Sequence, residues 1–266
     1  MKIWAIARIT FAGFFRNKVL YLFIAIFLCA LLSSLTDLLS LRSAARHESP
    51  NEVSAVLNMV GGILWLISGF GSLLAAWAAA DAVGGEMKSG TVLAVMARPV
   101  RRWEYLLGKY AGAELLMATY VLFMFGFIYL LTWIGGQRVQ TTPWVFIVYP
   151  LCRYAIYGAI GIFFVTFMHQ LAALVGVVVI SILAFLVKPG DNTLAFLPGA
   201  VRNAAYVLLP STNLLSEDRF LAITKTSLSK ITWEMHAVAL AHGLDYALIF
   251  FLLAVWSFQH RSLSRD

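Results

Sequence analysis

The sequence predicts an all-α integral membrane protein, an interpretation based on its composition, its apolar runs and the placement of its basic residues. Of 266 residues, 61% are hydrophobic and only 12% are charged, and the mean hydropathy is +0.83. Soluble domains carry about 25% charged residues, so this chain has too few charges to cover a water-exposed surface. We therefore expect residues 1–266 to form a single transmembrane domain with six transmembrane helices, an N-terminal interfacial helix and a short cytoplasmic helix.

Six apolar segments approach the length of about 20 residues that a bilayer core requires. The fourth and fifth are separated only by His169 and Gln170, which predicts a tight hairpin. The predicted spans are Val19–Leu41, Val56–Ala82, Ala111–Ile134, Trp144–Met168, Leu171–Val187 and Ala237–Phe258.

Two further segments are predicted at the membrane surface. Residues 1–18 mix basic and aromatic side chains, which is typical of a helix in the headgroup region; an unstructured basic leader is the alternative. The aromatic residues expected to reach into lipid are Trp4, Phe11, Phe14 and Phe15. Residues 188–236 form a long extracytoplasmic loop whose apolar pieces, broken by prolines, predict short interfacial or re-entrant helices.

Lysines and arginines near the span ends set the orientation, because cytoplasmic loops carry an excess of them. They gather before the first span and between the second and third, whereas those of 188–236 are spread over a long loop. Both termini are therefore predicted to be cytoplasmic, in a multi-pass protein of a bacterial inner or plasma membrane. This placement explains the net charge of +7, so membrane lipid is an expected partner and nucleic acid is not.

A polar segment, GGEMKSGTVLAVMARPVRRWEYLLGK, occupies residues 84–109 between the second and third spans. Gly84-Gly85 is predicted to end the second span, and Glu86 to begin a new helix, where a carboxylate is favoured. Pro99 interrupts that helix. The spacing predicts an amphipathic cytoplasmic helix over 84–99, with Met87, Thr91 and Val95 on one face. A basic tether that contacts only lipid is the alternative.

The end of this segment, Gly108-Lys109, invites comparison with the phosphate-binding pattern G-x-x-x-x-G-K-[ST]. Trp103 stands where the first glycine belongs, and Tyr110 stands where the hydroxyl that binds magnesium belongs. The pattern fails, so we expect this chain to bind no nucleotide in this way and no cofactor of its own.

The segment instead resembles the cytoplasmic signature of type-2 ABC exporter permeases, E-x-x-x-G-T-x-x-x-L/V-x-x-x-P-V-x-R followed by L-G-K. Six spans, a basic aromatic N-terminal segment and a long outer loop before the last span also look like that family. Arg98 departs from the small polar or apolar residue that many members carry there. The matching residues are Glu86, Gly90, Thr91, Val95, Pro99, Val100, Arg102 and Leu107-Gly108-Lys109.

The resemblance implies an exporter whose path is formed by two six-span halves, as a homodimer or as a heterodimer with a similar permease. Each half would bind a separate ABC ATPase subunit that carries ATP and magnesium. Residues 84–99 would be the coupling helix held by that ATPase, and the cargo stays open. The docking residues would be Glu86, Met87, Gly90, Thr91, Val95, Arg98, Pro99 and Arg102.

Charged residues inside predicted spans are functional candidates, because each is costly in hydrocarbon. Arg153 and Asp245 lie at similar depths, about 12–13 Å from the outer ends of their spans, which predicts an ion pair. The pair could lock two helices or line a substrate path, and an ion-coupled secondary transporter using it is the alternative function. The candidates are Asp37, Arg153, His242 and Asp245. Asp81 and Glu114 flank the cytoplasmic segment as candidate partners of Arg101, Arg102 or Lys109.

The sequence contains no catalytic motif of the intramembrane enzymes considered, and we expect no catalytic site on this chain. No H-E-x-x-H arrangement is present, and GFGSLL at 69–74 does not match the G-x-S-x-G pattern of a serine hydrolase. Cys29 and Cys152 lie in apolar runs without metal-ligand spacing, so no metal site is predicted.

Overall fold

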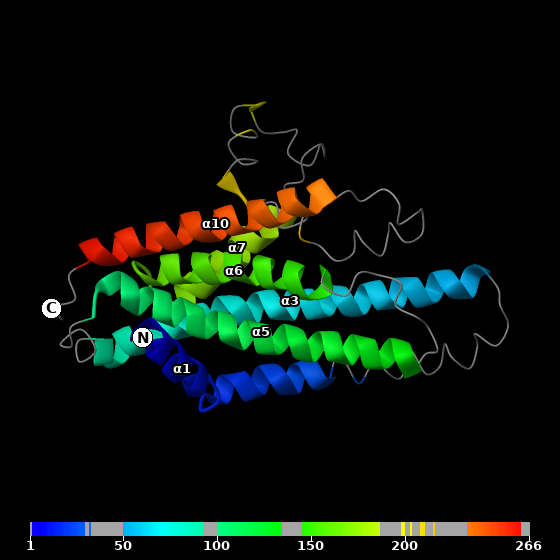
Figure 1. Cartoon of the computed structure of the whole chain (residues 1–266), viewed down its shortest axis with the longest axis horizontal. Coiled ribbons are helices and arrows are strands. Elements are labelled where there is room, and N and C mark those ends of the chain that lie inside the picture. The colour runs from blue at the N-terminus through cyan, green and yellow to red at the C-terminus, as the bar shows by residue number, and fades with distance from the viewer. Residues whose placement is uncertain are drawn as a thin grey trace.

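The structure is a computed structural model that describes residues 2–29, 32, 50–92, 100–134, 145–186, 198, 199, 203, 208–210, 215 and 233–261. Within these ranges the regular secondary structure is helical and contains no strand, which confirms the predicted all-α class. The long helices run side by side along the longest axis of the molecule (Figure 1).

The helices follow the predicted apolar segments, with differences at their ends. A helix over Lys18–Cys29 follows the first element. The labelled helices are α1 (Lys2–Phe14), α3 (Pro50–Ser89), α5 (Arg102–Ile134), α6 (Val145–Val165), α7 (Gln170–Leu186) and α10 (Trp233–His260).

Among the described residues, four helical segments are long and apolar enough to cross a membrane, and they agree with four predicted spans. They are Trp65–Ser89, Arg102–Phe127, Ile147–Val165 and Trp233–His260. The fifth predicted span coincides with α7, which is apolar but has only 17 residues. Of the first, Lys18–Cys29 is helical and residues 33–41 lie outside the described residues. The six-span count therefore stays a prediction.

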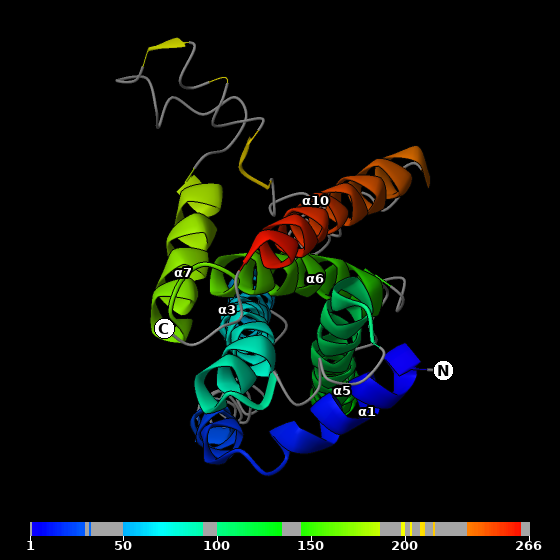
Figure 2. The same ribbon diagram turned by 90° about the vertical axis from the view of Figure 1, so that its left-hand side faces the viewer.

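Helix α6 is the centre of the bundle and packs against α3, α5, α7 and α10. Viewed from the end, it lies between α10 on one side and α3 and α5 on the other (Figure 2). Small residues allow this packing: a Cβ on Gly161 would lie 3.2 Å from the carbonyl oxygen of Ala76 and 3.4 Å from Cβ of Ala79. Helices in membranes associate through such close backbone contacts.

Helix α1 crosses α5 at the end of the bundle where the chain begins (Figure 2). It meets the Lys18–Cys29 helix at an angle of 62°. Its buried face consists of Ala7, Thr10 and Phe14. The prediction that Phe14 reaches into lipid is wrong, because its ring lies 5.8 Å from that of Trp77 in the protein core, whereas Trp4 is 59% exposed.

Helix α10 turns small residues, including Ala239, Gly243 and Ala247, toward α6 and larger apolar ones outward. A Cβ on Gly243 would lie 3.0 Å from Leu215, a fully buried residue of the predicted outer loop. The other described residues of that loop are 198, 199, 203, 208–210 and 233–236, the last four of which already belong to α10. The predicted short helices of the loop therefore lie mainly outside the described residues.

Candidate functional site

The polar segment between α3 and α5 begins later than the sequence predicts. Gly84-Gly85 does not end the second span: α3 continues to Ser89, and Gly90 has a φ of 73°. That left-handed conformation favours glycine and terminates the helix. Gly84 serves packing instead, because a Cβ there would lie 2.9 Å from Cγ2 of Val165.

Glu86 consequently lies in the last turn of α3 and not at the start of a new helix. Its carboxylate accepts a hydrogen bond from the Tyr105 hydroxyl (2.7 Å) and pairs with the Lys109 ammonium (2.5 Å). The Lys109 side chain is only 6% exposed, whereas that of Glu86 is 29% exposed. A lysine buried this deeply needs a counter-charge, so the contact joins the end of α3 to the first turns of α5.

Gly108 and Lys109 lie within α5, on a regular helix that cannot wrap a phosphate. Glycines 108 and 112 form a shallow surface on α5 that receives α1. A Cβ on Gly108 would lie 2.7 Å from Ile6, and one on Gly112 would lie 2.6 Å from Thr10. The L-G-K part of the signature therefore has two structural uses, glycine for the approach of α1 and lysine for Glu86.

Arginines cap two helix ends near this contact. The Arg102 guanidinium donates to the carbonyl oxygens of Phe258 (3.1 Å), Gln259 (2.8 Å) and Arg261 (3.2 Å) at the end of α10. The Arg261 guanidinium donates to the carbonyl oxygen of Thr166 at the end of α6. Cations stabilise helix C-termini, where carbonyl groups lack intrahelical partners. Arg102 thus contacts protein backbone, in addition to any headgroup.

A second polar contact joins α3 to the turn after α1 and to the first residue of α7. Asp81 on α3 accepts hydrogen bonds from the side-chain amides of Asn17 (3.0 Å) and Gln170 (2.8 Å). Asn17 also caps the Lys18–Cys29 helix, because its Oδ1 accepts from the Val19 amide (3.1 Å). Asp81 therefore does not pair with Arg101, Arg102 or Lys109. The sequence offered Asp81 as a candidate but gave no sign of its partners.

Five of the eight predicted docking residues lie within the described residues, and three lie outside them. Met87 is partly buried against the core, and Thr91 is exposed, with its hydroxyl 2.9 Å from that of Ser89. Glu86, Gly90 and Arg102 lie at the same end of the bundle. Val95, Arg98 and Pro99 lie outside the described residues, as do all of residues 93–99 of the predicted helix over 84–99.

The predicted intramembrane pair is not formed. Arg153 is buried, with 5% exposure, whereas Asp245 is exposed on α10, and the ion pairs between described residues do not include this one. Equal depth along two helices does not ensure facing side chains, because each helix also has a rotation about its axis. His242 is partly buried, and its ring lies against that of Tyr246 at a tilt of 51°, with centroids 4.7 Å apart. Asp37 lies outside the described residues.

Two polar groups in the bundle were missed or differently placed by sequence reasoning. The Tyr149 hydroxyl lies 2.7 Å from Nδ1 of His236, which joins α6 to α10. Glu114 lies on α5 beside Gly158, and its Oε1 is buried with no hydrogen-bond partner among the described residues. Glu114 therefore does not make its predicted pair with Arg101, Arg102 or Lys109.

The polar groups at the end of α3 are suited to holding helices together, and no cluster of three metal-ligating side chains occurs in the described part of the chain. Comparison with family models matches residues 4–263, almost the whole chain, to a model described as "ABC-2 family transporter protein". Among curated proteins no match is found.

Proposed function

The chain belongs to the ABC-2 family of transporter proteins, and on that premise we propose that it forms one half of the translocation path of an exporter. Membership makes it a transmembrane subunit of an ABC transporter, a transport component that is not itself catalytic. Membership also implies association with an ABC ATPase subunit. In the proposal, two copies, or one copy and a similar permease, form the path, and ATP with magnesium binds only to the ATPases.

The observation that carries the proposed coupling is the contact of Glu86 with Tyr105 and Lys109. Residues 90–101 connect α3 to α5, and the ATPase is proposed to dock on residues 90–99 of this connection. Because Glu86 ties the two helices just before and after this connection, a push on it moves both helices together. Arg102 extends the connection to α10 through the backbone carbonyls at its end.

The ion-coupled alternative loses its support. It required Arg153 and Asp245 to act together, but one is buried and the other exposed, without an ion pair between them among the described residues. An ATP-driven path needs no intramembrane charge pair, and the family match covers the segment with the docking signature.

The test is the Glu86→Gln variant, co-purified with the ABC ATPase and reconstituted in liposomes. Glutamine keeps the size of the side chain but removes the charge that holds Lys109. We expect the ATPase to stay bound while ATP hydrolysis in the complex no longer responds to the permease as it does in the wild type. The matched control is Glu234→Gln. Glu234 is exposed at the start of α10, far from the contact of Glu86 with Lys109.

A further variant tests docking itself. Replacing residues 91–98 by a Gly/Ser linker of equal length removes the proposed docking surface while leaving α3 and α5 intact. Loss of the ATPase from the purified complex is the expected result. Retention of the ATPase by this variant, or unchanged coupling in Glu86→Gln, would contradict the proposal.

A further inference from the structure

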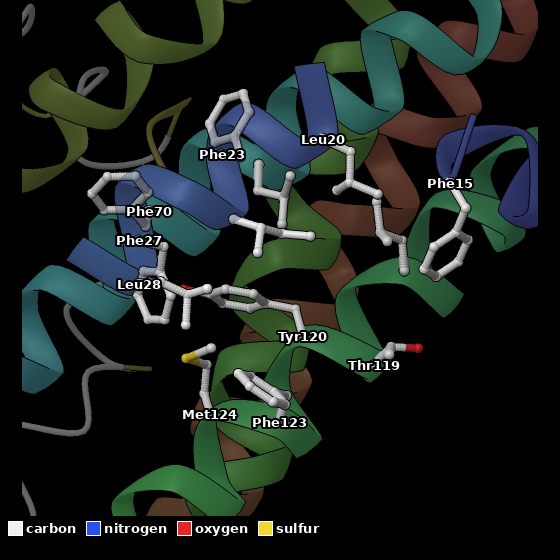
Figure 3. Close-up of a pocket in the computed structure, with 13 residues that line it drawn as sticks. Phe15, Leu20, Phe23, Phe27, Leu28, Phe70, Thr119, Tyr120, Phe123 and Met124 are labelled. Carbon is white, nitrogen blue, oxygen red and sulfur yellow. The ribbon is translucent and has the colours of Figure 1, made fainter. Parts of the chain in front are cut away.

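An apolar groove of about 280 Å³ lies between the Lys18–Cys29 helix, α3 and α5 (Figure 3). Its walls are aromatic and aliphatic side chains, among them Phe23, Phe27 and Met124. The two hydroxyl groups in the lining are already used: Tyr120 donates to the carbonyl oxygen of Ile67, and Thr119 to that of Leu115. The groove thus offers dispersion contacts and no available hydrogen bond, which suits a hydrocarbon chain.

The groove is open along one side. Its deep residues Leu20, Phe27 and Leu116 are at most 5% exposed, whereas the rim residues Ile24 and Phe123 are 43% and 59% exposed. The described chain therefore supplies a floor and walls but leaves the mouth uncovered. In a membrane this mouth faces lipid or another protein, so the chemistry at its ends decides between occupants.

Two exposed cations adjoin, in the chain, the lining residues at one end of the groove. Phe15 and Leu20 are lining residues, and Arg16 and Lys18 lie between them in the chain, both exposed. Two hydrogen bonds hold this turn: the Tyr21 hydroxyl donates to the carbonyl oxygen of Phe15 (2.8 Å), and Asn17 caps the following helix by accepting from the Val19 amide (3.1 Å). The ion pairs between described residues do not engage either cation.

We propose that the groove binds an anionic phospholipid, with one acyl chain between the three helices and the headgroup phosphate at Arg16 and Lys18. An apolar slot whose lining residues adjoin two exposed cations is complementary to an amphipathic anion. A wholly apolar protein face would fill the slot but leave the cations without a partner. The bound chain would fill the space between the Lys18–Cys29 helix and α5 and so support the 62° bend before it.

The chain-binding part is tested by native mass spectrometry of the full-length protein, delipidated in detergent and titrated with phosphatidylglycerol or phosphatidylcholine. Ile24→Trp places an indole in the groove, and Ile26→Trp makes the same change on the same helix outside the lining, at 48% exposure. We expect Ile24→Trp to weaken phosphatidylglycerol binding at least about fivefold and Ile26→Trp to leave it unchanged. Circular dichroism confirms that both variants fold.

The headgroup part is tested by Arg16→Gln and Lys18→Gln in the same titration. Each cation near an anionic lipid contributes about fivefold in affinity, so each change should weaken phosphatidylglycerol by about that factor and leave phosphatidylcholine unaffected. Lys88→Gln, on an exposed lysine away from the groove, is the control. Equal binding of the two lipids by the wild type, or equal effects of the two tryptophans, overturns the proposal. A change of dimer fraction in Ile24→Trp without loss of lipid would instead assign the groove to a second copy.

Discussion

At the scale of single residues, the end of α3 depends on an ion pair with unequal partners. The Lys109 side chain is 6% exposed and that of Glu86 is 29% exposed, so only the carboxylate can reach water if its partner is removed. Loss of one member of a buried pair leaves an uncompensated charge, and the cost depends on which member remains.

We expect Glu86→Gln to lower stability more than Lys109→Met. The first change leaves a buried ammonium with a neutral partner, which costs about 1–3 kcal/mol, whereas the second leaves a carboxylate that solvent can reach. The double variant should recover part of the loss. Thermal unfolding of the purified protein in detergent measures the order, and a larger loss for Lys109→Met would contradict it.

Gly90 provides a second residue-scale prediction. Its φ of 73° is strained for a side chain with a Cβ, although no atom lies within 4 Å of the Cβ position. We expect Gly90→Asn to be tolerated and Gly90→Val to cost at least about 1–2 kcal/mol, because asparagine adopts this conformation more readily. The valine variant should also uncouple ATP hydrolysis in the complex. Equal stability and coupling of the two variants would show that the conformation is not required.

At the scale of elements, two glycines of α5 let α1 pack closely against it and so fix the position of α1. Predicting a basic aromatic helix at the start of the chain was possible from composition, because the residue types alone indicate it. Its contact with α5 was not predictable, because Gly108 and Gly112 lie just over a hundred residues from Ile6 and Thr10 in the sequence. Their spacing of four places both on one helix face, but it does not identify the helix that packs there.

We expect Gly112→Val to displace α1 from α5. A Cβ at this position meets Thr10 at 2.6 Å and the carbonyl oxygen of Ala7 at 2.9 Å, and backbone cannot move aside cheaply. Protease cleavage within residues 2–17, measured on inverted membrane vesicles with the cytoplasmic side outward, should become faster. Gly126→Val is the matched control on the same helix, because nothing lies within 4 Å of its Cβ position. Similar cleavage rates in both variants would contradict the prediction that Gly112 holds α1 against α5.

At the scale of the whole molecule, one end of the bundle gathers the polar contacts. Glu86, Arg102 and Asp81 belong to three separate clusters there, and each joins two or three helices. The ends of α3 and α10 and the starts of α1 and α5 meet at this end in Figure 1. The basic residues that predict a cytoplasmic side therefore lie at the end of the bundle where the proposed docking segment begins.

This orientation gives a prediction for the intact cell. A single cysteine at Lys88 should react with a membrane-impermeant maleimide only after the membrane is opened, whereas one at Trp233 should react from outside. Lys88 is exposed at the end of α3, and Trp233 is 72% exposed at the far end of α10. Cys29 and Cys152 are replaced by serine as background. If Trp233→Cys reacted only after the membrane is opened and Lys88→Cys reacted from outside, the orientation would be the opposite of the predicted one.

The sequence by itself determined the membrane class and four helices long and apolar enough to span a bilayer, because apolar length and charge placement are properties of short local segments. It misplaced the end of α3, since Gly84 and Gly90 look alike until one packs against Val165 and the other adopts a positive φ. Its Arg153–Asp245 pair failed because depth does not fix rotation. Only the tertiary structure brought Glu86 to Lys109, Arg102 to the end of α10 and three helices around an apolar groove, because these contacts depend on which helix faces meet.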